Sequence, residues 1–139
     1  MTIKEIQDEI IDEFSMFDDW MQRYEYIIDL GKSLPLIEEG AKTDENLIKG
    51  CQSKVWLQGQ QAGNKIVFTA DSDAILTKGI IAILIRAFSN QKAADILDAD
   101  MDFIDGIGLK EHLSPTRANG LVSMIKNIKM YALAFNTKN

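Results

Sequence analysis

Cysteine, histidine and proline are scarce in this chain of 139 residues, which contains one cysteine, one histidine and two prolines. A lone cysteine excludes an internal disulfide, and a structural zinc site is excluded because it needs four ligands from cysteine and histidine. Long apolar runs are also absent: the longest, residues 80–85, is far shorter than the roughly 20 residues that cross a bilayer. The sequence therefore predicts neither a disulfide scaffold, nor a zinc module, nor a membrane protein.

Positive charge is scarce in the first third of the chain. Residues 1–45 carry 13 acidic and 4 basic side chains, whereas residues 46–139 carry 8 acidic and 11 basic ones, within a net charge of −6. The acidic third would be repelled by phosphate, so nucleic acid is not an expected partner. The N-terminus, MTIKEIQDEII, has no basic region followed by an apolar run, so we expect no signal peptide and a cytoplasmic location. A lone cysteine stays reduced there.

The composition, 46% hydrophobic and 26% charged, is typical of a soluble globular protein, and the length predicts a single domain over residues 1–139. Two β-branched or aromatic runs, at 55–57 and 66–68, are separated by a stretch rich in Gly, Gln and Asn, which predicts an antiparallel hairpin. A third, edge strand can form near 46–49. With the helices described next, we expect an α+β fold in which a small antiparallel sheet of two or three strands packs against several helices.

Capping residues mark the first two predicted helices. Thr2 and Glu5 form a capping box at the start of a helix that runs to about residue 16. Asp18 or Asp19 is expected to cap a second helix, which ends at Gly31. Their apolar residues recur at helical spacing, so we expect the two helices to pack together.

The second half of the chain predicts a central and a closing helix. Asp71 or Ser72 is expected to cap a helix of about 73–88, and this helix is apolar nearly all round, as a buried central helix would be. Ser114, followed directly by proline, is expected to cap a closing helix of about 115–135.

Cys51 lies near the end of a long connection, residues 32–54, that shows no helical or strand periodicity. Such a connection in a compact domain is usually functional or disordered. A free cysteine is often only a small buried hydrophobe. The flanking residues, however, are polar and basic in the order Lys-Gly-Cys-Gln-Ser-Lys. The two lysines and nearby backbone N–H groups would favour the thiolate, which is the reactive form of cysteine.

Two further features favour an exchange of sulfur at Cys51. Gly50 removes a side chain beside the sulfur, so the active site of another protein could approach closely. With no second cysteine in the chain, an oxidised or persulfidated Cys51 cannot collapse into an intramolecular disulfide. A single thiol of this kind can hold sulfur until a partner collects it.

Two other chemistries have weaker support. His112 could act as the base of a cysteine hydrolase if it reached Cys51, but it directly precedes a helix start, where histidine commonly serves local packing. An acidic cluster lacks the glycine and the terminal glutamate of an EF-hand, so we interpret it as a solvated turn and predict no metal site; it comprises Asp98, Asp100, Asp102 and Asp105.

The segment 46–57, with the sequence NLIKGCQSKVWL, resembles the cysteine loop of the SufE and CsdE proteins, which are sulfur acceptors in iron–sulfur cluster assembly. The GCxSxVW and SDA motifs are specific when they occur together in this order, and the resemblance covers nearly the whole chain. The further matches, in order, are Trp20 with Arg23-Tyr24, Leu30-Gly31 with Leu34-Pro35, Asp71-Ser72-Asp73-Ala74 through Gly79, 112–117 and 119–121.

The resemblance implies an α+β fold shared with the IscU-type scaffold proteins, with the cysteine displayed on a loop. It also implies that Cys51 takes sulfur, as a persulfide, from a cysteine desulfurase of the SufS or CsdA type and passes it to a cluster scaffold. The protein would stimulate that enzyme without being one, and it would need no cofactor, since pyridoxal phosphate belongs to the desulfurase. IscU-type scaffolds use several cysteines to hold a cluster, so this chain should carry sulfur without assembling the cluster.

The same resemblance suggests which residues surround Cys51. Gly50, Gln52 and Ser53 would shape the loop, and Asp73 and Arg117 match positions that the family places near it. The guanidinium of Arg117 could pair with Asp73 or with a carboxylate of the partner. The two tryptophans fall on apolar periodic positions and are expected in the core; they are Trp20 and Trp56.

Two alternatives to sulfur transfer stay open at this point. In the first, the protein is an adapter that binds and remodels the desulfurase, and Cys51 is incidental. In the second, Cys51 and His112 form the dyad of a hydrolase, which requires the two side chains to lie within hydrogen-bond reach. The sequence leaves open how deeply Cys51 is buried.

Overall fold

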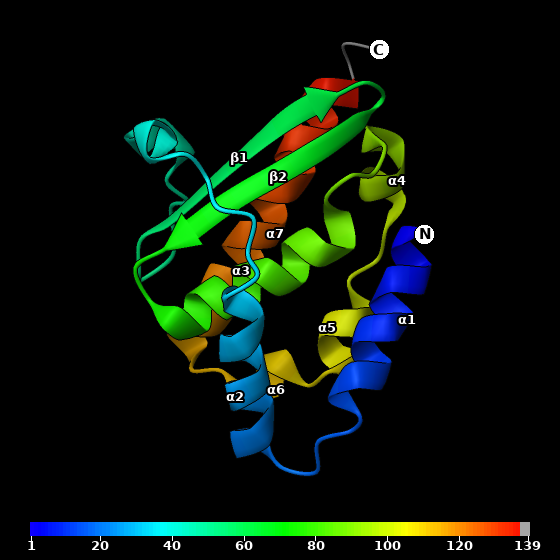
Figure 1. The fold of residues 1–139 in the computed structure, drawn as a ribbon, viewed down its shortest axis with the longest axis vertical. Coiled ribbons are helices and arrows are strands. Elements are labelled where there is room, and N and C mark those ends of the chain that lie inside the picture. The colour runs from blue at the N-terminus through cyan, green and yellow to red at the C-terminus, as the bar shows by residue number, and fades with distance from the viewer. Residues whose placement is uncertain (137–139) are drawn as a thin grey trace.

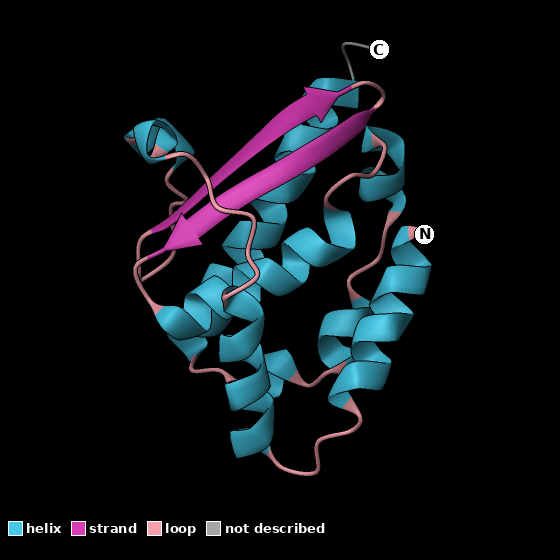
Figure 2. Ribbon diagram, in the orientation of Figure 1, coloured by secondary structure: helices cyan, strands magenta, loops and turns pink. Residues whose placement is uncertain are grey.

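The computed structural model describes residues 1–136, which form seven α-helices, two 3₁₀ turns and one two-stranded sheet (Figures 1 and 2). This arrangement confirms the predicted α+β fold. The helices are α1 (Ile3–Phe14), α2 (Trp20–Gly31), α3 (Ile75–Phe88), α4 (Ala93–Asp98), α5 (Asp102–Gly106), α6 (Leu109–His112) and α7 (Pro115–Asn136). The strands are β1 (Val55–Ala62) and β2 (Lys65–Ser72), and the 3₁₀ turns are η1 (Glu39–Ala41) and η2 (Asp44–Asn46). Within the described residues, no helix is both long enough and apolar enough to cross a membrane.

The two strands form the predicted antiparallel hairpin, paired from Val55 opposite Ser72 to Ala62 opposite Lys65. A two-residue turn joins them, and its first residue, Gly63, has a φ of +63°, which glycine adopts without strain. The third strand expected near 46–49 is reduced to a single bridge, in which Leu47 pairs with Trp56. One backbone hydrogen bond extends that contact, from Ile48 N to Val55 O at 2.8 Å. The segment therefore lies where the edge strand was predicted, without forming one.

Helix α3 is the centre of the molecule. It lies between the hairpin on one side and helices α1, α2 and α7 on the others, and most of its side chains are buried (Figure 1). This confirms the prediction that an all-round apolar helix occupies the core. Helices α1 and α2 both pack mainly on α3, and they meet each other through the edge-to-face rings of Phe14 and Tyr26, whose centroids are 5.2 Å apart.

The predicted N-terminal caps are confirmed at three helices, and the cap predicted for α3 is wrong. Thr2 Oγ1 accepts a hydrogen bond from Glu5 N at 3.1 Å, which is half of the capping box of α1. The other two confirmed caps are Asp19, which accepts from Gln22 N at 2.8 Å, and Ser114, which accepts from Arg117 N at 3.3 Å.

Helix α3 begins at Ile75, and its N-cap residue, Ala74, provides no side-chain cap. The prediction of Asp71 or Ser72 as the cap is therefore wrong, because β2 continues through Ser72 before the chain turns into the helix. Both side chains instead connect the end of β2 to the segments around it. Ser72 Oγ donates to Lys54 O at 2.8 Å, and Asp71 forms ion pairs with Lys42 of the preceding loop and with Lys78 of α3.

The acidic segment 98–105 is more helical than predicted. Its second half forms α5, because Phe103 and Ile104 are buried in the core and hold that turn of the chain against it. Lys129 of α7 holds the start of the segment and the end of α4 before it, since its Nζ donates to the carbonyl of Ala99 at 2.7 Å and to that of Ile96 at 2.5 Å. The four aspartates of this segment remain exposed, as expected for a solvated surface.

The crossing of α2 and α3 depends on the absence of a side chain at Gly79. A Cβ added there would lie 2.0 Å from the carbonyl oxygen of Ile27, which is backbone and cannot yield without moving the helix. The facing residue on α2 is also a glycine, Gly31, whose added Cβ would lie 3.0 Å from Gly79 N. Two small residues thus let the two backbones approach each other closely.

Gly79→Ala is expected to lower the free energy of unfolding by about 1–3 kcal/mol, the usual cost of overpacking a core. Alanine also gains about 1 kcal/mol of helix propensity over glycine, so the cost of the clash exceeds any net loss of stability by about that amount. The measurement is urea unfolding followed by circular dichroism. Gly40→Ala is the control, because a Cβ there meets no atom within 4 Å. A Gly79→Ala protein as stable as the wild type would contradict the proposed close contact.

Candidate functional site

Cys51 lies on the loop that connects α2 to β1, at the point where this loop touches helix α7. The thiol is half-buried, and its Sγ lies 3.6 Å from the carbonyl oxygen of Gly120, which accepts its weak hydrogen bond. Gly120 is buried inside α7, and a Cβ added there would come within 3.3 Å of the sulfur. The missing side chain of Gly120 therefore makes room for the cysteine.

Gly50 brings the loop onto the same helix. Its φ of +92° lies in the left-handed region that favours glycine. An added Cβ would also lie 2.5 Å from Oγ of Ser123, one turn further along α7. The sequence predicts that Gly50 lets the active site of another protein approach the sulfur; in the free protein, the space beside Gly50 is occupied by Ser123 of the chain's own helix α7.

A small cavity of about 40 Å³ opens beside Cys51. It is far smaller than the roughly 300–1,000 Å³ of ordinary small-molecule sites, so it suits a single added atom or small group better than a metabolite. Its floor is buried and consists of Thr77, Ile80, Gly120 and Met124. Cys51 and Ser53 are half-buried at its side, and its exposed rim consists of Gln52, Thr116 and Arg117.

Burial raises the pKa of the Cys51 thiol above its ordinary value. This corrects the expectation that the two flanking lysines favour the thiolate. Lys49 and Lys54 are both exposed, and neither lines the cavity, so desolvation of the sulfur dominates over their charge. In the free protein the sulfur is therefore held as a neutral thiol at neutral pH.

Asp73 connects the cysteine loop to the start of α3. Its Oδ1 accepts a hydrogen bond from Lys54 N at 3.0 Å, and its own N–H donates to Lys54 O at 3.2 Å. Asp73 does not line the cavity. It lies beside the loop, as the resemblance implied, and the contacts it makes there serve to hold the end of the loop in place.

Arg117 lies in the first turn of α7, where it lines the exposed rim of the cavity. Among the ion pairs of the described residues, none joins Arg117 to Asp73, so the first of its two predicted partners does not hold it. Its guanidinium is exposed to solvent and can meet a carboxylate of another protein.

His112 is not placed to act on Cys51. Its exposed ring stacks on Trp20, with the ring centroids 3.9 Å apart, and its backbone oxygen accepts a hydrogen bond from the Tyr24 hydroxyl. It does not line the cavity beside Cys51, and it is the only histidine of the chain. The described structure therefore contains no cysteine–histidine dyad.

Across residues 1–136, side chains of His, Cys, Asp and Glu nowhere gather in a group of three that could hold a metal ion.

The two tryptophans lie at the edge of the core and are partly exposed, which contradicts the prediction that they lie in the core. Both are only partly buried, and a cationic side chain covers each ring. Arg23 lies 5.3 Å from the ring centroid of Trp20, and Lys42 lies 5.4 Å from that of Trp56. Apolar periodicity does not distinguish such half-exposed positions from core ones.

Several residues of the cavity floor escaped the sequence prediction. Gly120 had a detectable indication, because a glycine inside a helix costs about 1 kcal/mol relative to alanine and often marks close packing. Thr77, Ile80 and Met124 had none, since each lies on an otherwise ordinary helical face and meets Cys51 only through the tertiary fold.

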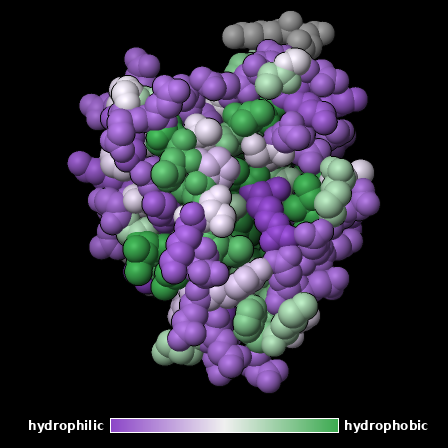
Figure 3. Space-filling view, in the orientation of Figure 1, coloured by the Kyte–Doolittle hydropathy of each residue, from purple (hydrophilic) through white to green (hydrophobic). Residues whose placement is uncertain are grey.

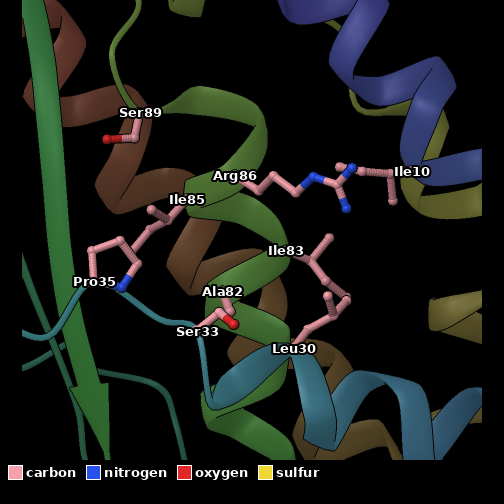
Figure 4. A pocket seen from close by; sticks show the side chains of 9 residues that line it. All are labelled: Ile10, Leu30, Ser33, Pro35, Ala82, Ile83, Ile85, Arg86 and Ser89. Carbon is pink, nitrogen blue, oxygen red and sulfur yellow. The ribbon is translucent and has the colours of Figure 1, made fainter. Parts of the chain in front are cut away.

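A second, larger cavity of about 310 Å³ lies among α1, α2 and α3 (Figure 4). It shares no lining residue with the Cys51 cavity. Apolar side chains gather at the centre of the face shown in Figure 3, where this recess opens. Its single charged residue, Arg86, is already paired with Glu9 at 2.7 Å and with Glu13. The recess therefore offers no free charge to a ligand.

Comparison with known proteins identifies the family. The family model SufE, described as an Fe-S metabolism associated domain, matches residues 8–132. The chain belongs to the SufE family. This confirms the resemblance inferred from the cysteine loop, and it assigns the protein a role in iron–sulfur metabolism.

Relatives in the SufE family match most of the chain. An uncharacterized SufE-like protein of Rhizobium meliloti (strain 1021) is 45% identical over 130 residues, covering 90% of this chain and 93% of that protein. One of Synechocystis is 36% identical, covering 91% and 79% respectively. SufE-like protein 1 of Arabidopsis thaliana, named as chloroplastic/mitochondrial, is 36% identical over 94% of this chain but 35% of its own length.

A solved structure supports the same fold. The solution structure of a hypothetical protein from Thermus thermophilus superposes with a TM-score of 0.79, covering 95% of this chain and 96% of that one. The two sequences are 16% identical, so the similarity concerns the fold alone.

The raised pKa of the SufE-family cysteine makes its alkylation depend on pH. We expect the rate of reaction of Cys51 with iodoacetamide to rise through a midpoint above that of the same thiol in the urea-unfolded chain, because burial removes water from the thiolate. The measurement is the alkylation rate by mass spectrometry between neutral and alkaline pH. A folded-state midpoint at or below the unfolded one would instead show that the lysines control the thiol.

Proposed function

We propose that this protein accepts sulfur from a cysteine desulfurase onto Cys51, as a persulfide, and delivers it for iron–sulfur cluster assembly. The observation that carries this proposal is the position of the chain's single cysteine, beside a cavity with room for one further atom. The exposed residues around that cavity leave it accessible to a partner. The family role in iron–sulfur metabolism is consistent with such a function.

The transfer step needs no external oxidant or reductant. The Cys51 thiolate attacks the outer sulfur of the persulfide on the desulfurase, so that a new S–S bond forms while the bond to the desulfurase cysteine breaks. That cysteine leaves as a thiolate, and the transferred sulfur keeps its oxidation state. The pyridoxal phosphate that releases sulfur from free cysteine belongs to the desulfurase, and Cys51 provides only the accepting thiolate.

The raised pKa of Cys51 has a consequence for this step. Because the free protein holds a neutral thiol, the proton must leave when the donor engages the loop. A thiol kept neutral between deliveries reacts slowly with stray oxidants and electrophiles, since the thiolate is the nucleophile. The proposed sulfur transfer thus becomes selective for a partner that provides a base or displaces the loop.

The loop must move outward for an in-line attack, since the sulfur now contacts Gly120 on α7. Gly50, with its positive φ, is a suitable hinge, and Asp73 holds the far end of the loop through Lys54. Loops that open on binding commonly gate such steps. On the rim, the solvated guanidinium of Arg117 can contact a carboxylate of the desulfurase, and electrostatic contacts of this kind mainly speed association.

A desulfurase of the SufS or CsdA type is the proposed donor, and a cluster scaffold is the proposed recipient. The adapter hypothesis, in which Cys51 is incidental, predicts stimulation of the desulfurase without sulfur on this protein. The hydrolase hypothesis requires a histidine base beside Cys51. His112, which would be that base, stacks on Trp20 instead.

Cys51→Ser is expected to abolish both persulfide formation and stimulation of the desulfurase, because serine cannot accept a sulfur atom in an S–S bond. Intact-protein mass spectrometry after incubation with desulfurase and cysteine should show one added sulfur on the wild type and none on the variant. Wild-type protein incubated without cysteine is the control for adventitious sulfur. Full stimulation by Cys51→Ser, or a wild type that stays unmodified, would favour the adapter.

A further inference from the structure

One largely buried threonine, Thr77, borders the Cys51 cavity. Two polar side chains are buried among the described residues, Gln7 at 2% exposure and Thr77 at 7%. Gln7 Nε2 donates to the carbonyl of Asp100 at 3.0 Å, whereas none of the side-chain hydrogen bonds found among the described residues involves the Thr77 hydroxyl.

The open space that Thr77 borders is the cavity beside Cys51. Every fully enclosed side-chain nitrogen or oxygen in the described residues has a hydrogen-bond partner. The unpartnered Thr77 hydroxyl must therefore retain contact with open space, and Thr77 lines the floor of this cavity. Thr77, whose hydroxyl is a possible donor, and the thiol-bearing Cys51 thus line the same recess.

The rest of the floor offers nothing else that could donate. It consists of the apolar side chains of Ile80 and Met124 and of Gly120, whose carbonyl already accepts from Cys51. The cavity volume of about 40 Å³ exceeds the roughly 10–15 Å³ that admits one water molecule, so one further heavy atom fits. An atom placed there would meet apolar walls and one hydroxyl.

We propose that the Thr77 hydroxyl donates a hydrogen bond to the outer sulfur of the Cys51 persulfide, and that this cavity holds that sulfur between delivery and release. The inference rests on the proposed function, because it concerns the loaded state of Cys51. A hydrogen bond to an anion stabilises it, so the bond favours the deprotonated persulfide. The two other hydroxyls of the cavity lining are less suited, since Thr116 is exposed at the rim and Ser53 is only half-buried.

The decisive variant is Thr77→Val, which keeps the shape of the side chain and removes the donor. The persulfide is made chemically, so that loading does not depend on a desulfurase: Cys51 is converted to a mixed disulfide with a small aromatic thiol, and hydrosulfide then displaces that thiol. One S–S bond forms as the other breaks, and the aromatic thiolate leaves. The loaded proteins are alkylated with iodoacetamide at a series of pH values and followed by mass spectrometry.

The expected result is a midpoint of persulfide alkylation raised by about one pH unit in Thr77→Val, the size of effect that a hydrogen bond to a charged group produces. Thr77→Ser should restore the wild-type midpoint, because it keeps the hydroxyl. Thr116→Val, at the rim of the same cavity, is the matched control and should leave the midpoint unchanged. Urea unfolding of all variants, which a purely structural role of Thr77 would change, should show little difference.

An unchanged midpoint in Thr77→Val would overturn the inference, as would an equal shift in Thr116→Val or a failure of Thr77→Ser to restore it. Such results would leave the proposed function intact, since transfer from a desulfurase is measured separately. Conversely, a wild type that takes no sulfur from a desulfurase would refute the proposed function while the chemically loaded proteins still report on Thr77.

Discussion

The contact between the cysteine loop and helix α7 determines the chemistry of this protein. It exists because two glycines remove side chains at the points of contact: Gly50 faces Ser123, and Gly120 faces the sulfur of Cys51. The contact half-buries the thiol, and burial in turn raises its pKa. Without this contact, the loop would present a solvated cysteine between two lysines. With it, the loop keeps a neutral thiol beside a small recess.

The rest of the fold serves to hold that contact in place. Helix α3 supplies Thr77 and Ile80 to the floor of the recess, and it is fixed by its close crossing with α2 at Gly79. The hairpin fixes the far end of the loop, since Lys54 directly precedes β1 and is bonded to Asp73. The core therefore acts on the site mainly by setting the spacing between α3 and α7, where a single added atom fits.

Sequence patterns predicted the local structure well and the environment of the thiol poorly. The hairpin, the caps at Thr2, Asp19 and Ser114 and the buried central helix follow from turn, capping and periodicity rules that act within a few residues. The state of the thiol was predicted wrongly, because the flanking lysines are visible in the sequence while the desolvating contact with Gly120 is not. Thr77 escaped prediction for the same reason, since its meeting with Cys51 joins residues far apart in the chain.

A crystal structure of the protein after loading by a working desulfurase tests the central claim most directly, namely that Cys51 receives a sulfur and shelters it against α7. The account predicts density for a second sulfur bonded to Cys51 Sγ and lying in the recess between α3 and α7. A cysteine that stays unmodified beside an active donor, or an outer sulfur that points into solvent, would contradict it.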